Sequence, residues 1–116
     1  MPRQSIFEMS FAKVYPMLIQ KAERKGRTKD EVNEVTSWLT GYTPEQIGDA
    51  LSSEISYVDF FKQALAYNPA SDMITGKICG IQIETIEDPL MKRIRQLDKL
   101  IDELAKGRPM EKVLRK

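Results

Sequence analysis

The segment from residue 88 to residue 107 constrains the fold more than any other part of this sequence. Asp88 and Pro89 are typical of a helix start, because Asp accepts hydrogen bonds from free N–H groups and Pro suits the first helical position. Apolar residues then recur at alternating spacings of four and three, namely Leu90, Ile94, Leu97, Ile101 and Leu104. A helix with one apolar face needs other elements to cover that face. The pattern therefore predicts a packed, mainly helical protein.

Three further helix starts are visible upstream. Thr28 and Thr43 are each followed three residues later by Glu or Gln, the pattern of a capping box. Ser56 predicts a cap for a fourth helix, which we expect to run until Asn68-Pro69 stops it.

The first helix is complicated by Pro16, because a proline inside a helix costs about 3 kcal/mol. We therefore expect a short turn over 11–14 and a regular helix from about Tyr15 to Gly26. The region from residue 71 to residue 87 has two interpretations: a short helix followed by an extended segment, which we favour, or a small hairpin within 74–86.

Together these signals predict a mainly α, compact orthogonal bundle of five or six helices with a short extended or hairpin element near 74–86. The chain has 116 residues, and we expect 1–116 to form a single helical domain. The expected core consists of Leu18, Val35, Leu39, Ile47, Leu51, Phe61, Leu65, Leu97, Ile101 and Leu104.

Composition excludes several chemistries. There is no histidine, which removes the commonest general base and metal ligand. Eighteen basic and 17 acidic residues give a net charge of +1, which argues against a strongly basic nucleic-acid binder. No run of apolar residues is long enough for a membrane span, and no secretory signal is visible. With one cysteine and hence no internal disulfide, a cytoplasmic location is expected.

Cys79 is a candidate reactive thiol, since it lies between glycines and follows Lys77. However, a catalytic cysteine normally needs a base, so a buried structural cysteine is the favoured interpretation. We expect no catalytic residue, metal site or cofactor. The acidic residues before and on the last helix are read as solvated surface, with Asp88 as a cap.

Two basic clusters are candidates for anion binding. If they meet in the fold, they could hold a phosphate or an RNA backbone. The first consists of Arg24, Lys25, Arg27 and Lys29, and the second of Lys92, Arg93, Arg95 and Lys99.

The spacing of the second and third helices suggests a helix-turn-helix, but residues 42–61 contain no Lys or Arg. Glu45, Asp49, Glu54 and Asp59 would repel phosphates there, so recognition of a specific DNA sequence is disfavoured.

Several short blocks, in order along almost the whole chain, resemble a bacterial domain-of-unknown-function family numbered 2200. The blocks are Met9-Ser10-Phe11-Ala12, Val14-Tyr15-Pro16, Lys25-Gly26-Arg27-Thr28, Trp38-Leu39-Thr40-Gly41-Tyr42, Ile74-Thr75-Gly76, Ile78-Cys79-Gly80, Glu87-Asp88-Pro89-Leu90-Met91 and residues 97–107. This resemblance implies a stand-alone, mainly helical bacterial protein. It implies no activity and transfers no functional residue.

Two classes of function remain. The first is a small non-catalytic binding or protein-interaction module, with a homodimer through 89–105 as an option that the apolar stripe suggests. The second is a small-molecule or anion-binding protein, or an enzyme, that uses carboxylate, Tyr and Arg side chains in a pocket.

Overall fold

The computed structural model describes residues 9–78 and 80–114, and within them the chain forms six α-helices, two short 3₁₀ helices and a two-stranded hairpin. In chain order these are α1 (Phe11–Glu23), α2 (Lys29–Thr40), α3 (Pro44–Leu51), α4 (Tyr57–Lys62), η1 (Pro69–Met73), β1 (Lys77–Ile78), β2 (Ile81–Gln82), η2 (Ile83–Thr85), α5 (Pro89–Ala105) and α6 (Met110–Val113). The predicted mainly α bundle with a short hairpin is confirmed.

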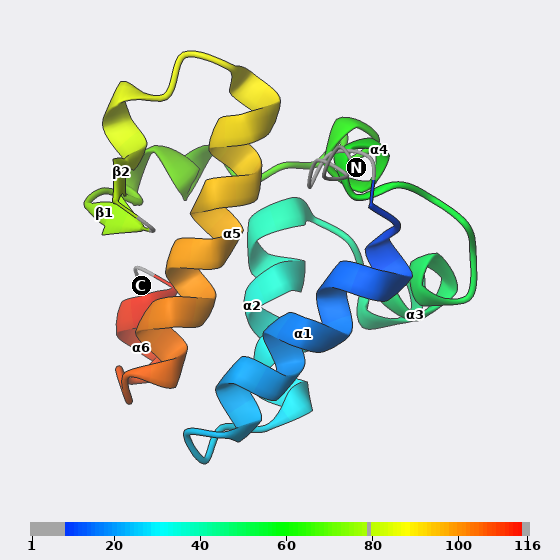
Figure 1. Cartoon of the computed structure of the whole chain (residues 1–116), viewed down its shortest axis with the longest axis horizontal. Helices are drawn as coiled ribbons and strands as arrows, with labels where there is room; N and C mark the ends of the chain where they lie inside the picture. Colours follow the sequence, from blue (N-terminus) through cyan, green and yellow to red (C-terminus); the bar gives the residue numbers. More distant parts are fainter. Residues whose placement is uncertain (1–8, 79, 115–116) are drawn as a thin grey trace, which may run out of the picture.

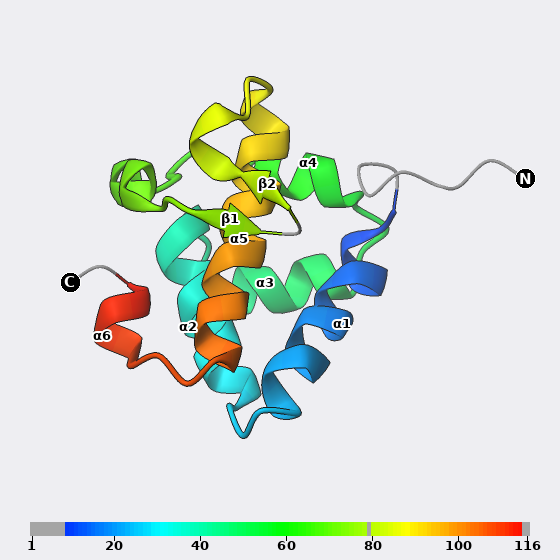
Figure 2. The same ribbon diagram turned by 60° about the vertical axis from the view of Figure 1, so that its left-hand side comes forward.

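Helix α5 is the element around which the others are arranged. Helices α1, α2, α4 and α6 contact it, and so do β1 and η2 (Figures 1 and 2). Its apolar residues Ile94, Leu97, Ile101 and Leu104 are fully buried by these neighbours. The apolar stripe that the sequence shows is therefore used for packing within the molecule.

The predicted capping residues all act as caps. The Thr28 hydroxyl accepts from the N–H of Glu31 at 3.1 Å, and the Glu31 carboxylate accepts from the N–H of Thr28 at 3.0 Å. Thr43 and Gln46 form the same pair of bonds at the start of α3. Asp88 accepts from two N–H groups in the first turn of α5. Because these bonds involve residues close in sequence, the sequence pattern was sufficient to predict them.

Helix α1 differs from the prediction, since it runs without a break from Phe11 through Pro16. The expected separate turn over 11–14 is wrong. Pro16 is exposed, while Phe11 and Val14 before it and Ile19 after it are buried in the same core. Burying each such side chain contributes about 1.5–3 kcal/mol, which offsets the roughly 3 kcal/mol that an internal proline costs.

Helix α4 also differs, because it begins after Ser56 as predicted but ends at Lys62 instead of near Asn68. Leu65 lies beyond the helix end and is 97% exposed, so its predicted place in the core is wrong. The chain leaves the helix because Asn68 is tied to α2: its backbone N–H donates to the Leu39 carbonyl at 2.9 Å.

The region between α4 and α5 contains elements of both interpretations. The 3₁₀ helix η1 comes first, and an antiparallel hairpin follows in which Lys77 pairs with Gln82 and Ile78 with Ile81. The element near 74–86 is thus a hairpin. Of the interpretation that we favoured, the short helix is present as η1, whereas the extended segment without a partner strand is wrong. The N–H of Ile83 donates to the Gly76 carbonyl at 2.9 Å and closes the ladder.

The core is rich in aromatic side chains. Phe60 and Phe61 are adjacent in sequence, yet both are buried, with ring centroids 5.5 Å apart and ring planes at 88°. Phe11 stacks on Phe60 at 3.9 Å. Of the expected core residues, Val35, Leu39, Ile47, Phe61, Leu97, Ile101 and Leu104 are buried, whereas Leu18 and Leu51 are half-buried.

Candidate functional site

A small hollow of about 210 Å³ lies where the chain after α4 and η1 meets the first turns of α5. We call it the Tyr67–Arg93 pocket. Its lining residues are Tyr67, Ser71, Asp72, Pro89, Lys92, Arg93 and Gln96. It combines Arg, Lys, Tyr and carboxylate side chains, which are the residue types expected for a ligand pocket.

Arg93 is held in place from two sides. One guanidinium N–H donates to the Phe61 carbonyl at 2.9 Å, close to the C-terminal end of α4. The guanidinium carbon also lies 4.1 Å from the centre of the Tyr67 ring, in cation–π geometry. The other guanidinium N–H groups make no hydrogen bond within residues 9–78 and 80–114. A fixed guanidinium with unused donors is suited to binding an anion.

Tyr67 and Gln96 form the floor of the pocket. The Tyr67 hydroxyl donates to Gln96 Oε1 at 2.6 Å, and Gln96 Nε2 donates to the Ser71 carbonyl at 3.3 Å. Burial raises the pKa of Tyr67 well above its ordinary value, although the charge of Arg93 acts in the opposite direction. At neutral pH the phenol therefore keeps its proton and serves as a hydrogen-bond donor, not as a base.

The two predicted basic clusters lie at different ends of α5. The end of α1 is beside the C-terminal half of α5, where Lys21 pairs with Asp102 at 3.4 Å. Lys92 precedes Asp102 by ten residues, which is about 15 Å along a helix. In Figure 1 the turn joining α1 to α2 is at the bottom and the start of α5 at the top. The clusters therefore do not form one anion-binding surface.

The members of the first cluster do not converge on a hollow. Arg24, Lys25 and Lys29 are exposed, and Arg27 pairs with Glu31 at 2.8 Å.

The second cluster is divided. Lys92 and Arg93 line the Tyr67–Arg93 pocket, whereas Arg95 pairs with Asp98 at 3.2 Å. The Lys99 ammonium donates to the Lys77 carbonyl at 3.3 Å. Of the predicted basic residues, Lys92 and Arg93 thus share the Tyr67–Arg93 pocket, and Lys99 lines a different hollow at the C-terminal end of α5.

Cys79, the candidate reactive thiol, lies outside the described residues. The acidic residues before α5 have local roles: Asp88 caps the helix, and Glu84 accepts from the Gly76 N–H and from Gln82 Nε2. Within the described ranges, no three acidic or cysteine side chains are grouped as metal ligands would be. The same ranges contain no helix of the length and hydropathy that a membrane span requires.

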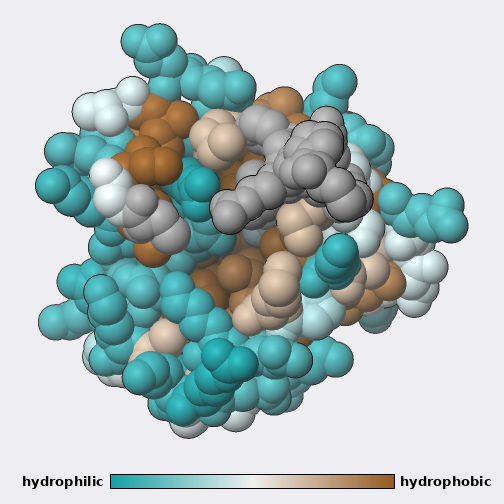
Figure 3. All heavy atoms as spheres, in the orientation of Figure 1, coloured by the Kyte–Doolittle hydropathy of each residue, from teal (hydrophilic) through white to brown (hydrophobic). Residues whose placement is uncertain are grey.

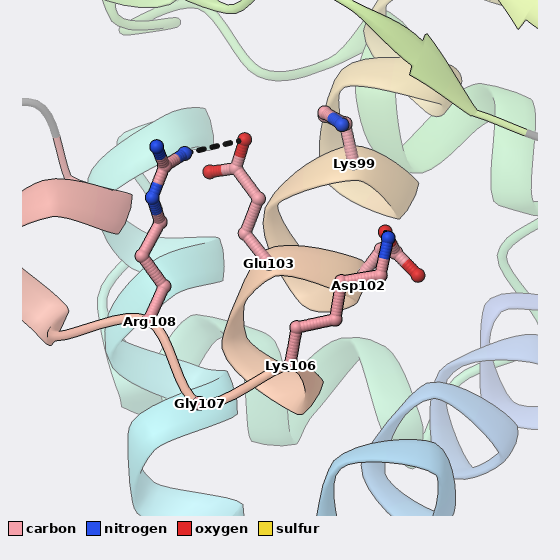
Figure 4. A pocket seen from close by; sticks show the side chains of 6 residues that line it. All are labelled: Lys99, Asp102, Glu103, Lys106, Gly107 and Arg108. Atoms are coloured by element: carbon pink, nitrogen blue, oxygen red, sulfur yellow. Dashed lines mark ion pairs between the residues drawn. The ribbon is translucent and has the colours of Figure 1, made fainter.

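A second hollow, of about 390 Å³, lies at the C-terminal end of α5 (Figure 4). Arg108 turns toward the buried Glu103 and pairs with it at 3.1 Å. Asp102 pairs with Lys106 at 3.0 Å and with Lys21. Because each of these carboxylates already has a basic partner, the hollow is best explained as an ion-pair network that links α1, α5 and the following turn. The expectation that the acidic residues of the last helix are solvated is wrong for Glu103, which is buried.

Comparison with known proteins identifies the family of this chain and a solved structure that is similar to it. A family model described as an uncharacterised protein conserved in bacteria, DUF2200, matches residues 5–115. The chain belongs to this family. The crystal structure of the uncharacterised protein SP1917 is similar to it, with 51% sequence identity, a TM-score of 0.92 and coverage of 98% of this chain and 93% of that one. No curated protein matches the chain. DUF2200 membership thus confirms the resemblance seen in the sequence blocks, and it assigns no activity.

Of the residues that line the Tyr67–Arg93 pocket in this DUF2200 protein, the sequence predicts only Lys92 and Arg93 as binding residues, and it misses the hydrogen-bonded pair Tyr67 and Gln96. Neither Tyr67 nor Gln96 is among the candidate residues that the sequence pattern indicates. A signal was present for Gln96, because it follows Arg93 by three residues on one helix face and stands next to the apolar stripe. Nothing in the sequence indicated that Tyr67 would reach that face.

Proposed function

We propose that the protein is a small non-catalytic binding module, and that its Tyr67–Arg93 pocket holds an anionic group of the ligand, a carboxylate or a phosphate. The observation that carries the proposal is the position of the Arg93 guanidinium. It is fixed by the Phe61 carbonyl and the Tyr67 ring before any ligand arrives, so little side-chain freedom is lost on binding.

Charge and size support an anionic group over a whole small molecule. Lys92 and Arg93 are the two cations of the lining, and the exposed Asp72 is its one carboxylate. The hollow of about 210 Å³ is smaller than the 300–1,000 Å³ of ordinary small-molecule sites. We therefore expect it to take a single carboxylate or phosphate, which can belong to a larger partner.

The polar groups of the pocket favour binding over catalysis. The raised pKa of Tyr67 keeps its hydroxyl protonated, and its bond to Gln96 already uses that proton. Lys92 and Arg93 supply donors for an anion, whereas the Tyr67 phenol is available neither as a general base nor as a nucleophile.

Nuclear magnetic resonance titration tests the proposal. The ¹⁵N-labelled protein is titrated separately with inorganic phosphate, with acetate and with a short peptide containing glutamate. We expect saturable shifts of the Arg93 Nε–H and of the Gln96 side-chain amide, with a dissociation constant of about 1 mM, which corresponds to about 4 kcal/mol. The relative strength of the three probes identifies the kind of anion.

Variants make the test specific. Arg93→Met retains an apolar side chain over Tyr67 but removes the charge, and it should weaken binding about tenfold or more, since a bond to a charged group contributes roughly 1.5–3 kcal/mol. Lys92→Gln should weaken it less. Lys25→Gln, in the other basic cluster, is the matched control and should bind as the unmodified protein does. Shifts centred on residues 24–29, or equal binding by Arg93→Met, would refute the proposal.

A further inference from the structure

A third hollow, whose charged lining residues are acidic and not basic, lies along the outer side of α2. It has a volume of about 470 Å³ and is closed by Pro44 at the start of α3 and by Leu114 after α6. We call it the acidic groove. The α2 residues that line it are Asp30, Asn33, Glu34, Ser37 and Trp38.

The groove carries negative charge that no basic side chain compensates within the described part of its lining. Asp30 and Glu34 are exposed, and they lie four residues apart on one face of α2. Among the residues that the structure describes, none that lines the groove is a lysine or an arginine. Neither carboxylate forms an ion pair within the described chain, whereas Glu31 on the same helix pairs with Arg27 at 2.8 Å.

Like charges at this spacing oppose each other, and a cation placed between them would remove that repulsion. The electrostatics of the groove therefore select a positively charged occupant.

Trp38 adds an aromatic surface to the same row of side chains. It follows Glu34 by four residues, so carboxylate, carboxylate and indole succeed one another along the helix. The indole is half-buried, and its N–H makes no hydrogen bond among the described residues. Pro44 and Leu114 supply further apolar contact. A ligand that matches these side chains has two parts: an apolar stem, and a cationic head that can stack on an aromatic ring.

We propose that the acidic groove binds an arginine side chain of a partner protein. Arginine fits better than lysine because its planar guanidinium stacks on aromatic rings and forms paired bonds to carboxylates. The inference goes beyond the proposed anion site, since it uses other elements, the opposite charge and a different class of ligand group. The module would then have one surface for an anionic group and another for a basic segment.

Trp38 makes the test direct, because it is the one tryptophan of the chain and its fluorescence reports on the groove itself. The full-length protein is titrated with the peptide acetyl-Gly-Arg-Gly-amide, and with the same peptide carrying lysine or the neutral isostere citrulline. We expect a saturable change with the arginine peptide, at least threefold weaker binding of the lysine peptide, and none of the citrulline peptide.

The acidic residues provide the variants. Glu34→Gln and Asp30→Asn should each weaken arginine-peptide binding by fivefold or more at low salt, and Glu54→Gln, an exposed residue elsewhere, should leave it unchanged. Equal binding by Glu34→Gln, or equal binding of the citrulline peptide, would overturn the inference. Arg93→Met should bind the arginine peptide normally, so a failure here is distinguishable from a failure of the anion site.

Discussion

Gly41 is the position where a single methyl group is expected to disturb the fold most clearly. The residue ends α2 with φ of +82°, and a Cβ at this place would lie 2.5 Å from the carbonyl oxygen and 2.6 Å from the Cβ of Ala66. Both contacts are far shorter than van der Waals distance. Gly41→Ala therefore strains the backbone of residue 41 and also displaces the segment that leads to Tyr67.

The expected loss of unfolding free energy in Gly41→Ala is the sum of a backbone effect and a steric effect. Substitutions at two other glycines, Gly26 and Gly48, serve to measure these effects separately. A left-handed conformation costs an ordinary residue about 1–2 kcal/mol, and overpacking adds roughly 1–3 kcal/mol. Gly26 has φ of +85° but no atom within 4 Å of a built Cβ, so Gly26→Ala should show the backbone effect alone. Gly48 lies inside α3 with open space around it, and Gly48→Ala should stabilise the protein by about 0.5–1 kcal/mol.

Urea denaturation followed by circular dichroism measures the free energy of unfolding of the three variants. We expect Gly41→Ala to lose about 2–5 kcal/mol, clearly more than Gly26→Ala. If the two variants lose the same amount within about 0.5 kcal/mol, the close approach of Ala66 has no energetic effect, and our account of how this loop is positioned is wrong.

Three further predictions concern single side chains. Leu65→Gln should change the free energy of unfolding by less than about 0.5 kcal/mol in the same denaturation experiment, because Leu65 is 97% exposed; a larger loss would mean that it is covered in solution. Tyr67→Phe should lose about 1–3 kcal/mol, since Gln96 Oε1 is left without its donor, and an unchanged midpoint would contradict this. Burial raises the pKa of Tyr15 to about 12, so absorbance near 295 nm should show its ionisation in the folded protein only well above pH 10. Between pH 10 and pH 12 the folded chain therefore keeps a proton on Tyr15 that the unfolded chain has lost. The contribution of Tyr15 to the free energy of unfolding is complete below pH 10 and decreases as the pH rises toward 12. Full ionisation of Tyr15 at pH 10 would refute the assignment.

The parts of the fold that sequence analysis predicted well are those fixed by neighbours along the chain. A capping box or a proline start depends on residues three or four positions apart, so Thr28, Thr43 and Asp88 could be assigned from the printed sequence. The apolar stripe of α5 was also visible, because its period is that of the helix itself.

The errors occur where a contact distant in sequence decides the outcome. Helix α4 ends early because Asn68 bonds to the carbonyl of Leu39, which lies 29 residues earlier, and so Leu65 is left in solvent. Pro16 stays inside a helix because the core on both sides retains it. No local pattern contains either interaction.

The candidate site was predictable only in part for the same reason. Lys92 and Arg93 were singled out by their charge, but a charge alone does not show whether an arginine is fixed or free. The fixing partners are the Phe61 carbonyl and the Tyr67 ring, and the chain folds back through the hairpin before Arg93 reaches them. The acidic groove was missed entirely, because Leu114 joins α2 through tertiary contact.

The apolar stripe also suggested a homodimer through 89–105, and the packing of α5 bears on that option. Its apolar side chains are enclosed by other elements, and Figure 3 shows hydrophilic residues over the region where the C-terminal half of α5 and α6 lie. The stripe therefore no longer argues for self-association, and the dimer stays a prediction without a supporting contact.

The central place of α5 has a consequence for how the protein is made. On the ribosome, α1, α2 and α4 are made well before residues 89–105, yet all three helices pack against α5. Until the last third of the chain has been synthesised, Phe11, Val35 and Phe61 lack a complete core to enter. A nascent chain stalled before Asp88 should therefore expose apolar surface and be a substrate for chaperones or proteases, while a chain released after α5 can fold at once.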